Sequence, residues 1–145
     1  MATSEQAIAA LVHAYAERLD AGDLEGVARL FVDATFRSTR GGVYHGPQAL
    51  LAVLRRLVIL YEGSPRTRHV ITNLSLEVEE GADTAAGRAY YTVFQGTPTL
   101  PLQPILAGRY EDRFVRTGGM WRFAERLVHV DLVGDLSQHV RGGLA

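Results

Sequence analysis

The stretch from Tyr15 to Phe36 constrains the fold of this chain more than any other part of the sequence. Gly22 lies where a helix is expected to end, because glycine adopts the positive φ of a helix C-terminus at no steric cost. Asp23 follows as a candidate N-cap, whose carboxylate can accept a hydrogen bond from a free N–H of the next helix. Residues 34–38 then have the composition of a short strand. The stretch therefore predicts two helices separated by a tight break, followed by a strand.

Three helices are expected in the first half of the chain. Thr3 and Gln6 can form a capping box, and apolar residues at helical spacing continue from there to about Ala21. The second helix is expected over residues 24–31. The third is expected to begin at the Gly-Pro pair of residues 46–47, since proline is favoured in the first turn of a helix, and to end at the next Gly-Ser-Pro triplet.

The second half of the chain is typical of long strands joined by hairpin turns. The strands are expected at residues 68–79, 84–95, 105–116 and 120–131. Residues 96–104 contain three prolines and are predicted to form a loop. Helices followed by a strand meander indicate an α+β domain, with helices on one face of an antiparallel sheet. We expect a single domain at residues 1–137 and a loose C-terminal tail at residues 138–145.

Composition excludes several classes of protein. The absence of cysteine excludes disulfides, thiolate catalysis and zinc–cysteine sites. The formal net charge is -1 at pH 7 and no basic stripe is present, which argues against nucleic-acid binding. No apolar run approaches the ~18 residues of a membrane span, and the N-terminus has no basic segment before an apolar run. We therefore expect a cytoplasmic protein that binds neither nucleic acid nor membrane.

Two motifs resemble a known superfamily. They are Tyr-x4-Asp-x-Gly-Asp-Leu, at residues 15–24, and Leu-Phe-x-Asp-Ala-Thr-Phe, at residues 30–36. Together they resemble the opening of the SnoaL-like and NTF2-like superfamily, which includes scytalone dehydratase, bile-acid dehydratase, lindane dehydrochlorinase and ketosteroid isomerase. The resemblance extends more loosely over nearly the whole chain. It implies a cone-shaped α+β barrel, in which a strongly curved antiparallel sheet wraps a pocket closed by three N-terminal helices.

Asp20 is the first candidate catalytic residue. It lies at the edge of the apolar stripe of the first helix, in the last turn, where the helix dipole disfavours an anion. The simple interpretation is a solvated acid at a helix end. The functional interpretation comes from the resemblance, because dehydratase-like and dehydrochlorinase-like proteins carry an aspartate at the matching place. Its partner in those proteins is a histidine at the start of the first long strand, which His69 matches.

His69 and Asp20 together have the chemistry of a general base. An aspartate bonded to one imidazole nitrogen fixes the tautomer and leaves the other nitrogen basic. The unperturbed pKa of histidine, about 6.5, suits proton transfer near neutral pH. Three other histidines have no neighbours at metal-ligand spacing, so we interpret them as structural or surface residues and expect no metal: His13, His45 and His129.

Tyr15 lies in the middle of the apolar stripe, where ketosteroid isomerases have a tyrosine that hydrogen-bonds the substrate oxygen. The base in those enzymes is an aspartate just after the first strand, but residues 35–39 here contain no carboxylate. The resemblance therefore does not extend to the steroid-isomerase mechanism. Tyr15 remains either a donor to a developing oxyanion or a core tyrosine with its hydroxyl satisfied.

Four further residues are candidate substrate contacts. Asn73 shares strand parity with His69 and would point the same way, or is a polar residue at a strand edge. Leu54 lies on the apolar face of the third helix. Arg109 and Arg126 could each bind an anionic group, since the dehydrochlorinase-like branch uses an arginine in leaving-group departure. The alternative for both arginines is a solvated cross-strand ion pair with a nearby glutamate.

Two classes of function fit these residues. The first is a cofactor-independent lyase or isomerase, dehydratase-like or polyketide-cyclase-like, that acts on a hydrophobic, polycyclic or aromatic small molecule. The second is a non-catalytic ligand-binding or assembly module, such as the small subunit of ring-hydroxylating dioxygenases. The joint presence of Asp20 and His69 favours the enzyme, since an assembly subunit has no chemical need for the pair.

The same sequence predicts a homodimer or a larger homo-oligomer. Residues of the long strands must in part face outward by parity, among them Tyr90, Phe94, Phe114 and Val115. The resemblance implies that this outer face is buried against a second subunit. The proline-containing loop at residues 96–104 is expected to border the pocket entrance, with Leu100 and Leu102 covering an apolar ligand or a neighbouring subunit.

Overall fold

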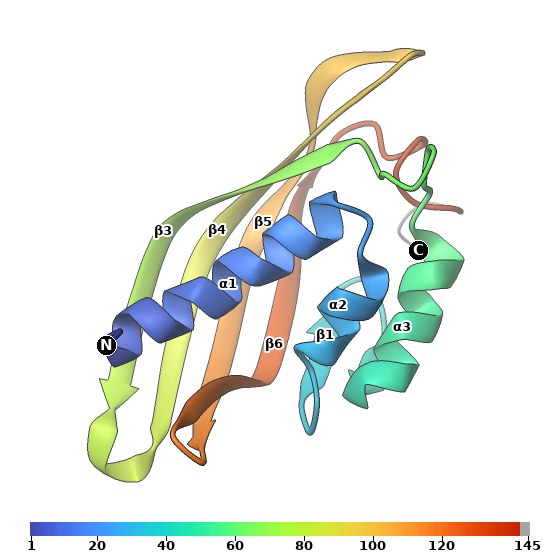
Figure 1. Cartoon of the computed structure of the whole chain (residues 1–145). Helices are drawn as coiled ribbons and strands as arrows, with labels where there is room; N and C mark the ends of the chain where they lie inside the picture. The colour runs from blue at the N-terminus through green and yellow to red at the C-terminus, as the bar shows by residue number, and fades with distance from the viewer. Residues whose placement is uncertain (143–145) are drawn as a thin grey trace.

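Four long strands form the body of the molecule, and three helices pack on one face of their sheet (Figure 1). The structure is a computed structural model that describes residues 1–142. The helices are α1 (Ser4–Asp20), α2 (Leu24–Arg29) and α3 (Gly46–Leu57), with one 3-10 turn, η1 (Glu80–Ala82). The strands are β1 (Thr35–Ser38), β2 (Val43–His45), β3 (Thr67–Glu79), β4 (Thr84–Thr97), β5 (Leu100–Thr117) and β6 (Met120–Val133). The α+β class expected from the sequence is confirmed.

The strands form one mixed sheet in the order β2-β1-β6-β5-β4-β3. The long strands pair antiparallel, as expected, but β1 pairs with β6 in parallel. α1 crosses the inner face of the long strands, while α2 and α3 lie beside the β1 edge (Figure 1). The helices therefore close one side of a curved sheet.

The start of α1 forms as the sequence predicts. Thr3 accepts a hydrogen bond from the backbone N–H of Gln6, and the Gln6 side chain accepts one from the backbone of Thr3. This reciprocal pair satisfies two of the N–H groups that a helix N-terminus leaves free. Asp23 caps α2 with a single hydrogen bond, which its carboxylate accepts from the N–H of Gly26.

Gly22 allows the end of α1 to approach the segment that leads into β3. Its φ is +77°, and a Cβ at this position would lie 1.9 Å from the carbonyl oxygen of Gly63. We expect Gly22→Ala to destabilise the fold by more than about 1 kcal/mol, since the side chain adds a clash to backbone strain. Gly119→Ala is the control, because Gly119 has a φ of +80° and open space around it. Urea unfolding should show the larger loss for Gly22→Ala, and equal losses would contradict the close approach.

Bulges change which residues face the interior. In β3 the register shifts between Thr72 and Ser75, where Asn73 adopts a φ of +55°. Between β5 and β6, Arg113 lies opposite Glu125, but the next residue of β5, Phe114, lies opposite Phe123, so β6 contains one extra residue at this point. Each bulge adds one residue to its strand, bends the strand and reverses the alternation of side chains beyond it. The sheet is therefore strongly curved, and strand parity does not hold along its full length.

The prediction of a loop at residues 96–104 is wrong, because β4 and β5 continue through these residues as paired strands. Gln95 pairs with Gln103, Thr97 pairs with Leu100, and the intervening turn contains only residues 98–99. Register shifts on this hairpin accommodate its prolines, since proline is tolerated at bulges where no ladder hydrogen bond is required. At its tip Leu100 is buried, while Leu102 is 76% exposed.

The C-terminal segment also differs from the expected loose tail. Val140 bridges to Val58, and the carbonyl oxygen of His139 accepts from the N–H of Ile59. The carbonyl oxygen of Gln138 accepts from the Tyr61 hydroxyl. Residues 138–141 are therefore held against the fold, and residues 143–145 lie outside the described part of the chain.

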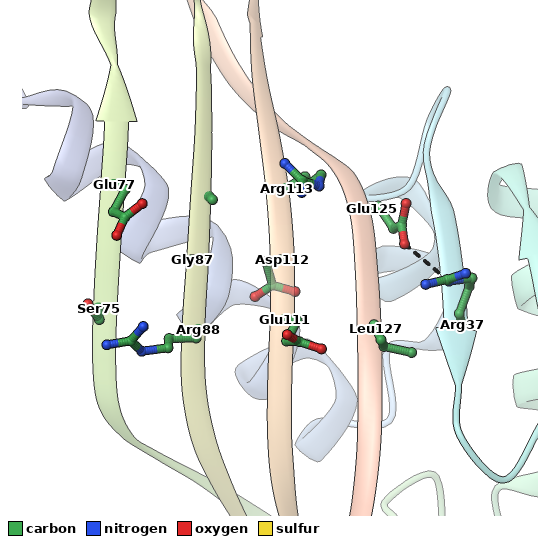
Figure 2. A pocket seen from close by; sticks show the side chains of 11 residues that line it. Arg37, Ser75, Glu77, Gly87, Arg88, Glu111, Asp112, Arg113, Glu125 and Leu127 are labelled. Atoms are coloured by element: carbon green, nitrogen blue, oxygen red, sulfur yellow. Dashed lines mark ion pairs between the residues drawn. The ribbon is translucent and has the colours of Figure 1, made fainter.

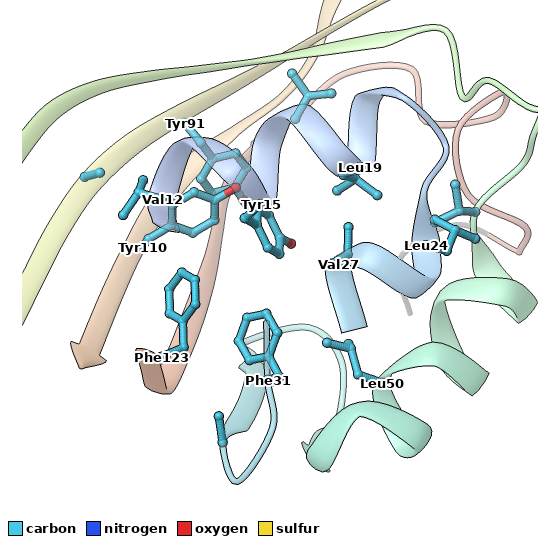
Figure 3. Packing of buried hydrophobic residues seen from close by; sticks show 14 of the residues in the cluster. Val12, Tyr15, Leu19, Leu24, Val27, Phe31, Leu50, Tyr91, Tyr110 and Phe123 are labelled. Atoms are coloured by element: carbon cyan, nitrogen blue, oxygen red, sulfur yellow. The ribbon is translucent and has the colours of Figure 1, made fainter. Parts of the chain in front are cut away.

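The core lies between the helices and the concave face of the sheet (Figure 3). Apolar side chains of α1 and α2 pack there against aromatic side chains of the strands, among them Val12, Tyr15, Leu19, Val27, Phe31, Tyr91, Tyr110 and Phe123. Phe114 belongs to this core and does not face outward, whereas Tyr90 is 53% exposed on the opposite face. Within residues 1–142, no helix is long and apolar enough to cross a membrane.

Candidate functional site

Asp20 and His69 lie in hydrogen-bonding contact where the end of α1 meets the start of β3. The Oδ1 atom of Asp20 lies 2.6 Å from Nδ1 of His69 and 2.8 Å from the hydroxyl oxygen of Thr67. Its Oδ2 atom accepts a hydrogen bond of 2.7 Å from the backbone N–H of His69. The two side chains are only 10% and 6% exposed. The carboxylate is therefore held by three donors in a largely enclosed space.

Local structure explains why this acid is tolerated at a helix C-terminus. The helix dipole disfavours an anion in the last turn of α1. Three hydrogen bonds from β3 offset that cost, because charge-assisted hydrogen bonds are among the strongest in proteins. Burial alone would raise the pKa of Asp20, but the hydrogen bonds and charge of His69, together with the bond from Thr67, lower it below the ordinary 3.8. Asp20 is thus ionised at neutral pH.

The ionised carboxylate defines the tautomer of His69. A carboxylate can only accept hydrogen bonds, so Nδ1 of His69 must carry the proton that it shares with Asp20. In the neutral imidazole the remaining nitrogen, Nε2, is then unprotonated and basic. The pair consequently has the arrangement of an oriented general base.

Tyr15 lies five residues before Asp20 on α1 and belongs to the hydrophobic core. Its ring is 5% exposed and contacts the rings of Phe31, Phe36 and Tyr110. Burial raises the pKa of Tyr15 above 10.0, an effect that the charge of Arg126 opposes. The phenol therefore stays protonated and retains a hydrogen to donate.

Arg126 faces the interior, which strand parity did not predict. Its guanidinium is fully buried and forms two hydrogen bonds with Asp112, of 2.8 and 2.9 Å. It also lies 3.7 Å from the centre of the Tyr110 ring and 4.4 Å from that of Tyr15. Burial would lower the pKa of Arg126, but the charge of Asp112 raises it. One nitrogen, Nη1, has no hydrogen-bond partner among the described residues.

Three other candidate residues lie apart from the Asp20–His69 pair, which we call the dyad. Arg109 forms an exposed ion pair with Asp131, at 2.8 and 3.1 Å, and it lines a surface hollow together with Asn73 and Tyr90, a hollow that does not include His69. Asn73 is exposed at the β3 bulge, and this bulge removes the shared parity with His69. Leu54 is half-buried on α3 and packs against the hydrophobic core.

The three histidines that we interpreted from the sequence as structural or surface residues occupy positions of that kind. His13 is exposed on α1. His45 bonds to the hydroxyl of Thr35, and His129 bonds to Glu111. Among residues 1–142 no group of three or more His, Cys, Asp or Glu residues could hold a metal ion.

His139 was missed by the sequence analysis. It is 6% exposed, and its Nδ1 is buried without a hydrogen-bond partner in the described chain. Burial and the nearby charge of His69 lower its pKa from 6.5 to about 4, while Asp20 acts in the opposite direction. No local signal in the sequence marks this residue, because its burial depends on contacts with segments far away in the chain.

The hollows described on this molecule do not contain the dyad. One, of about 310 Å³, lies on the face of the sheet away from the helices and is lined largely by charged residues (Figure 2). A second, of about 480 Å³, adjoins it around Asn73 and Tyr90. The third, of about 410 Å³, lies at the β4–β5 hairpin and includes Thr67, which bonds Asp20. The hydrophobic pocket expected beside His69 is not among these three.

The chain belongs to the SnoaL-like family, whose model matches residues 1–127. A single-substitution variant of Rv3472, a protein of unknown function from Mycobacterium tuberculosis, shares 32% identity; the match covers 87% of this chain and 70% of that one, with a TM-score of 0.71. None of the curated proteins matches this chain.

Two structures from Novosphingobium aromaticivorans are also similar. One is provisionally named as the beta subunit of an aromatic-ring-hydroxylating dioxygenase, with 27% identity, 88% of each chain covered and a TM-score of 0.70. The other is provisionally named a scytalone dehydratase, with 24% identity, 90% and 86% covered and a TM-score of 0.72. The NTF2-like, cone-shaped fold implied by the sequence motifs is thereby confirmed.

Proposed function

We propose that this protein is a cofactor-independent lyase or isomerase of the dehydratase type, which acts on a hydrophobic, aromatic or polycyclic small molecule. The observation that carries the proposal is the hydrogen bond between Asp20 and His69 in an enclosed site. An aspartate that orients a histidine through Nδ1 leaves Nε2 available as a base at neutral pH. The scytalone dehydratase name of one structural relative supports the same class.

In the proposed reaction, Nε2 of His69 removes a proton from the carbon next to a carbonyl group. The electrons of the broken C–H bond move onto the carbonyl oxygen to give an enolate. Protonated His69 then donates its proton to a β-hydroxyl group as the C–O bond breaks, and water leaves. The enolate electrons form the new C=C bond, the carbonyl group is restored, and His69 returns to its neutral form.

The neighbouring charges favour this sequence of steps. Ionised Asp20 stabilises the imidazolium form of His69 while the proton is in transit. Tyr15 keeps its hydroxyl proton, and its ring contacts the buried cation Arg126, so this part of the cone is suited to a developing oxyanion. Arg126 is therefore the arginine that we assign to substrate stabilisation, and Leu54 supplies part of the apolar surroundings.

A direct test uses a β-hydroxyketone of a fused aromatic system, whose dehydration gives a naphthol with strong ultraviolet absorption. We expect the protein to accelerate naphthol formation above the buffer rate, and to catalyse exchange of the α-proton when the reaction runs in D₂O. If no member of a panel of such ketones is dehydrated or exchanged faster than in buffer, the proposed function fails.

Asp20→Asn should distinguish the effect of orienting the His69 ring from the effect of the negative charge of Asp20. Asparagine preserves the shape and keeps one acceptor oxygen for Nδ1 of His69 and the Thr67 hydroxyl, but its NH2 group cannot accept from the backbone N–H of His69, and it cannot stabilise the imidazolium form of His69. We expect kcat to fall by at least about tenfold, because the charge that stabilises imidazolium is lost, and the melting temperature to fall by a few degrees, because one buried hydrogen bond is lost. Steady-state kinetics and thermal unfolding of the same preparation measure both. A kcat equal to that of the wild type would contradict the role of the charge.

A non-catalytic assembly role is the second candidate. It is favoured by the likeness to the dioxygenase beta subunit and by the outer face of the sheet, which carries charges of both signs (Figure 2). Arg37, Arg88 and Arg113 lie there among Glu77 and Glu125. Such a face can complement itself electrostatically across a two-fold axis.

We propose that the outer face of the sheet joins two copies of this chain. Val70 and Tyr90 add apolar area to it, since they are 42% and 53% exposed. Light scattering at micromolar concentration is expected to give at least the mass of a dimer. Tyr90→Glu should shift the population toward the monomer, because it replaces exposed apolar area of the proposed interface with a charge. A monomer mass for the unaltered protein would contradict this assembly.

A further inference from the structure

His139 is a buried polar group that the proposed mechanism does not use. It is 6% exposed, and Nδ1 has no partner among residues 1–142. An unsatisfied buried nitrogen is costly, so such a group in a folded protein needs an explanation. The proximity of His139 to Asp20 and His69 provides such an explanation.

A series of contacts brings His139 to the same end of the cone as Asp20. The side chain of Gln95, on β4, donates both to the carbonyl of Gln138 and to the carbonyl of Pro65. Two residues after Pro65, Thr67 donates its hydroxyl proton to Asp20. Gln95 is fully buried, so this connection between the C-terminal segment and the start of β3 is shielded from water.

The electrostatic environment of His139 agrees with this placement. The ionisable groups within reach are His69 and Asp20. Of the other elements packed around it, β4 presents the neutral Gln95, and Tyr61 uses its hydroxyl on the carbonyl of Gln138. Burial and the charge of His69 outweigh the opposing effect of Asp20 on the pKa of His139, so its ring is neutral at physiological pH.

We propose that His139 is a second, uncharged imidazole of the Asp20–His69 site and hydrogen-bonds the hydroxyl or carbonyl group of the substrate through Nδ1. This inference rests on the proposed function for the nature of the reaction. The C-terminal segment, Leu136 to Arg141, thus forms one wall of the site and carries a binding residue. A neutral imidazole suits this role because it can accept from a hydroxyl or donate to a carbonyl without competing with His69 for the substrate proton.

The charge state of His139 can be read from the ¹⁵N shifts of its ring. At pH 5.5 an exposed histidine, with an ordinary pKa of about 6.5, is mostly protonated. We expect the His139 ring to be neutral at this pH, and we expect added 1-naphthol to shift its Nδ1 resonance. A ring that is protonated at pH 5.5, or a resonance that saturating 1-naphthol does not move, would overturn the inference.

Turnover of the β-hydroxyketone distinguishes a substrate-binding role of His139 from a structural one. His139→Leu should raise KM about five- to tenfold, the loss of about one hydrogen bond, with kcat within about twofold. Its melting temperature should be no lower than that of the wild type, because the substitution removes a buried unpartnered nitrogen. His139→Asn, which keeps a polar atom near the position of Nδ1, should restore most of the affinity.

The two proposals fail in different ways. If His69→Ala abolishes turnover while His139→Leu leaves KM unchanged, the dyad functions and the role of His139 is wrong. If the protein does not dehydrate the ketones but 1-naphthol still shifts the Nδ1 resonance of His139, the site binds ligand and the proposed reaction is wrong. A lower melting temperature for His139→Leu with unchanged KM would assign His139 a structural role.

Discussion

His69→Ala is expected to lower the dehydration rate of the β-hydroxyketone by about 10²- to 10⁴-fold, the usual contribution of a general base. The fold should persist, because Asp20 keeps its hydrogen bonds from the Thr67 hydroxyl and from the backbone N–H at position 69. Initial rates followed through the naphthol absorbance measure the effect. The variant should therefore lose activity while its unfolding transition resembles that of the wild type.

His13→Ala is the matched control for this substitution. His13 is an exposed histidine on α1, outside the candidate site, so its removal should leave the rate within about threefold of wild type. If His69→Ala changes the rate by less than about threefold as well, well under 1 kcal/mol of transition-state stabilisation, His69 is not the base.

Asp112→Ala is expected to cost about 3–5 kcal/mol of unfolding free energy, because it leaves the guanidinium of Arg126 buried without a counterion. That guanidinium is fully enclosed and lies against the rings of Tyr15 and Tyr110, so water cannot replace the lost carboxylate without disturbing the core. Urea unfolding monitored by circular dichroism gives the difference.

Asp131→Ala provides the control, since it breaks an ion pair of almost the same geometry between the same two strands. Arg109 and Asp131 also form two hydrogen bonds, but both side chains are more than one-third exposed. Exposed pairs contribute about 0.2–1 kcal/mol. Equal losses for Asp112→Ala and Asp131→Ala would show that burial of the Arg126 pair has no energetic consequence.

The sequence predicted those features that depend on local chemistry. The capping box at Thr3, the helix end at Gly22 and the N-cap at Asp23 are set by residues within one turn of each other. The contact between Asp20 and His69 was also anticipated, but from resemblance to a superfamily motif. Residues so far apart in sequence carry no local signal that they will meet.

Strand parity failed at the bulges. Asn73 was expected on the face of His69, and the bulge at that residue places it in solvent. Arg126 follows a bulge in β6 and therefore faces the core, where a strict alternation from Trp121 and Phe123 would have placed it outside. The positions of such bulges depend on the curvature that the whole sheet needs to close around its core, so a single strand does not reveal them.

The C-terminal segment was misjudged for a similar reason. Its glycines and its position at the end of the chain are typical of a loose tail. In the structure, side chains from β4 and from the segment after α3 hold it, through Gln95 and Tyr61. Tertiary hydrogen bonds of this kind decide the burial of His139, and they leave no periodic pattern in the sequence.

The protonation of the His69 ring is the most direct test of Asp20 and His69 as an oriented general base. We predict that, at pH 7.5, ¹⁵N shifts place the proton of the neutral ring on Nδ1, bonded to Asp20, and leave Nε2 unprotonated. The opposite tautomer, with the proton on Nε2 and a bare Nδ1, would contradict this assignment, because Nε2 could then accept no proton from a substrate.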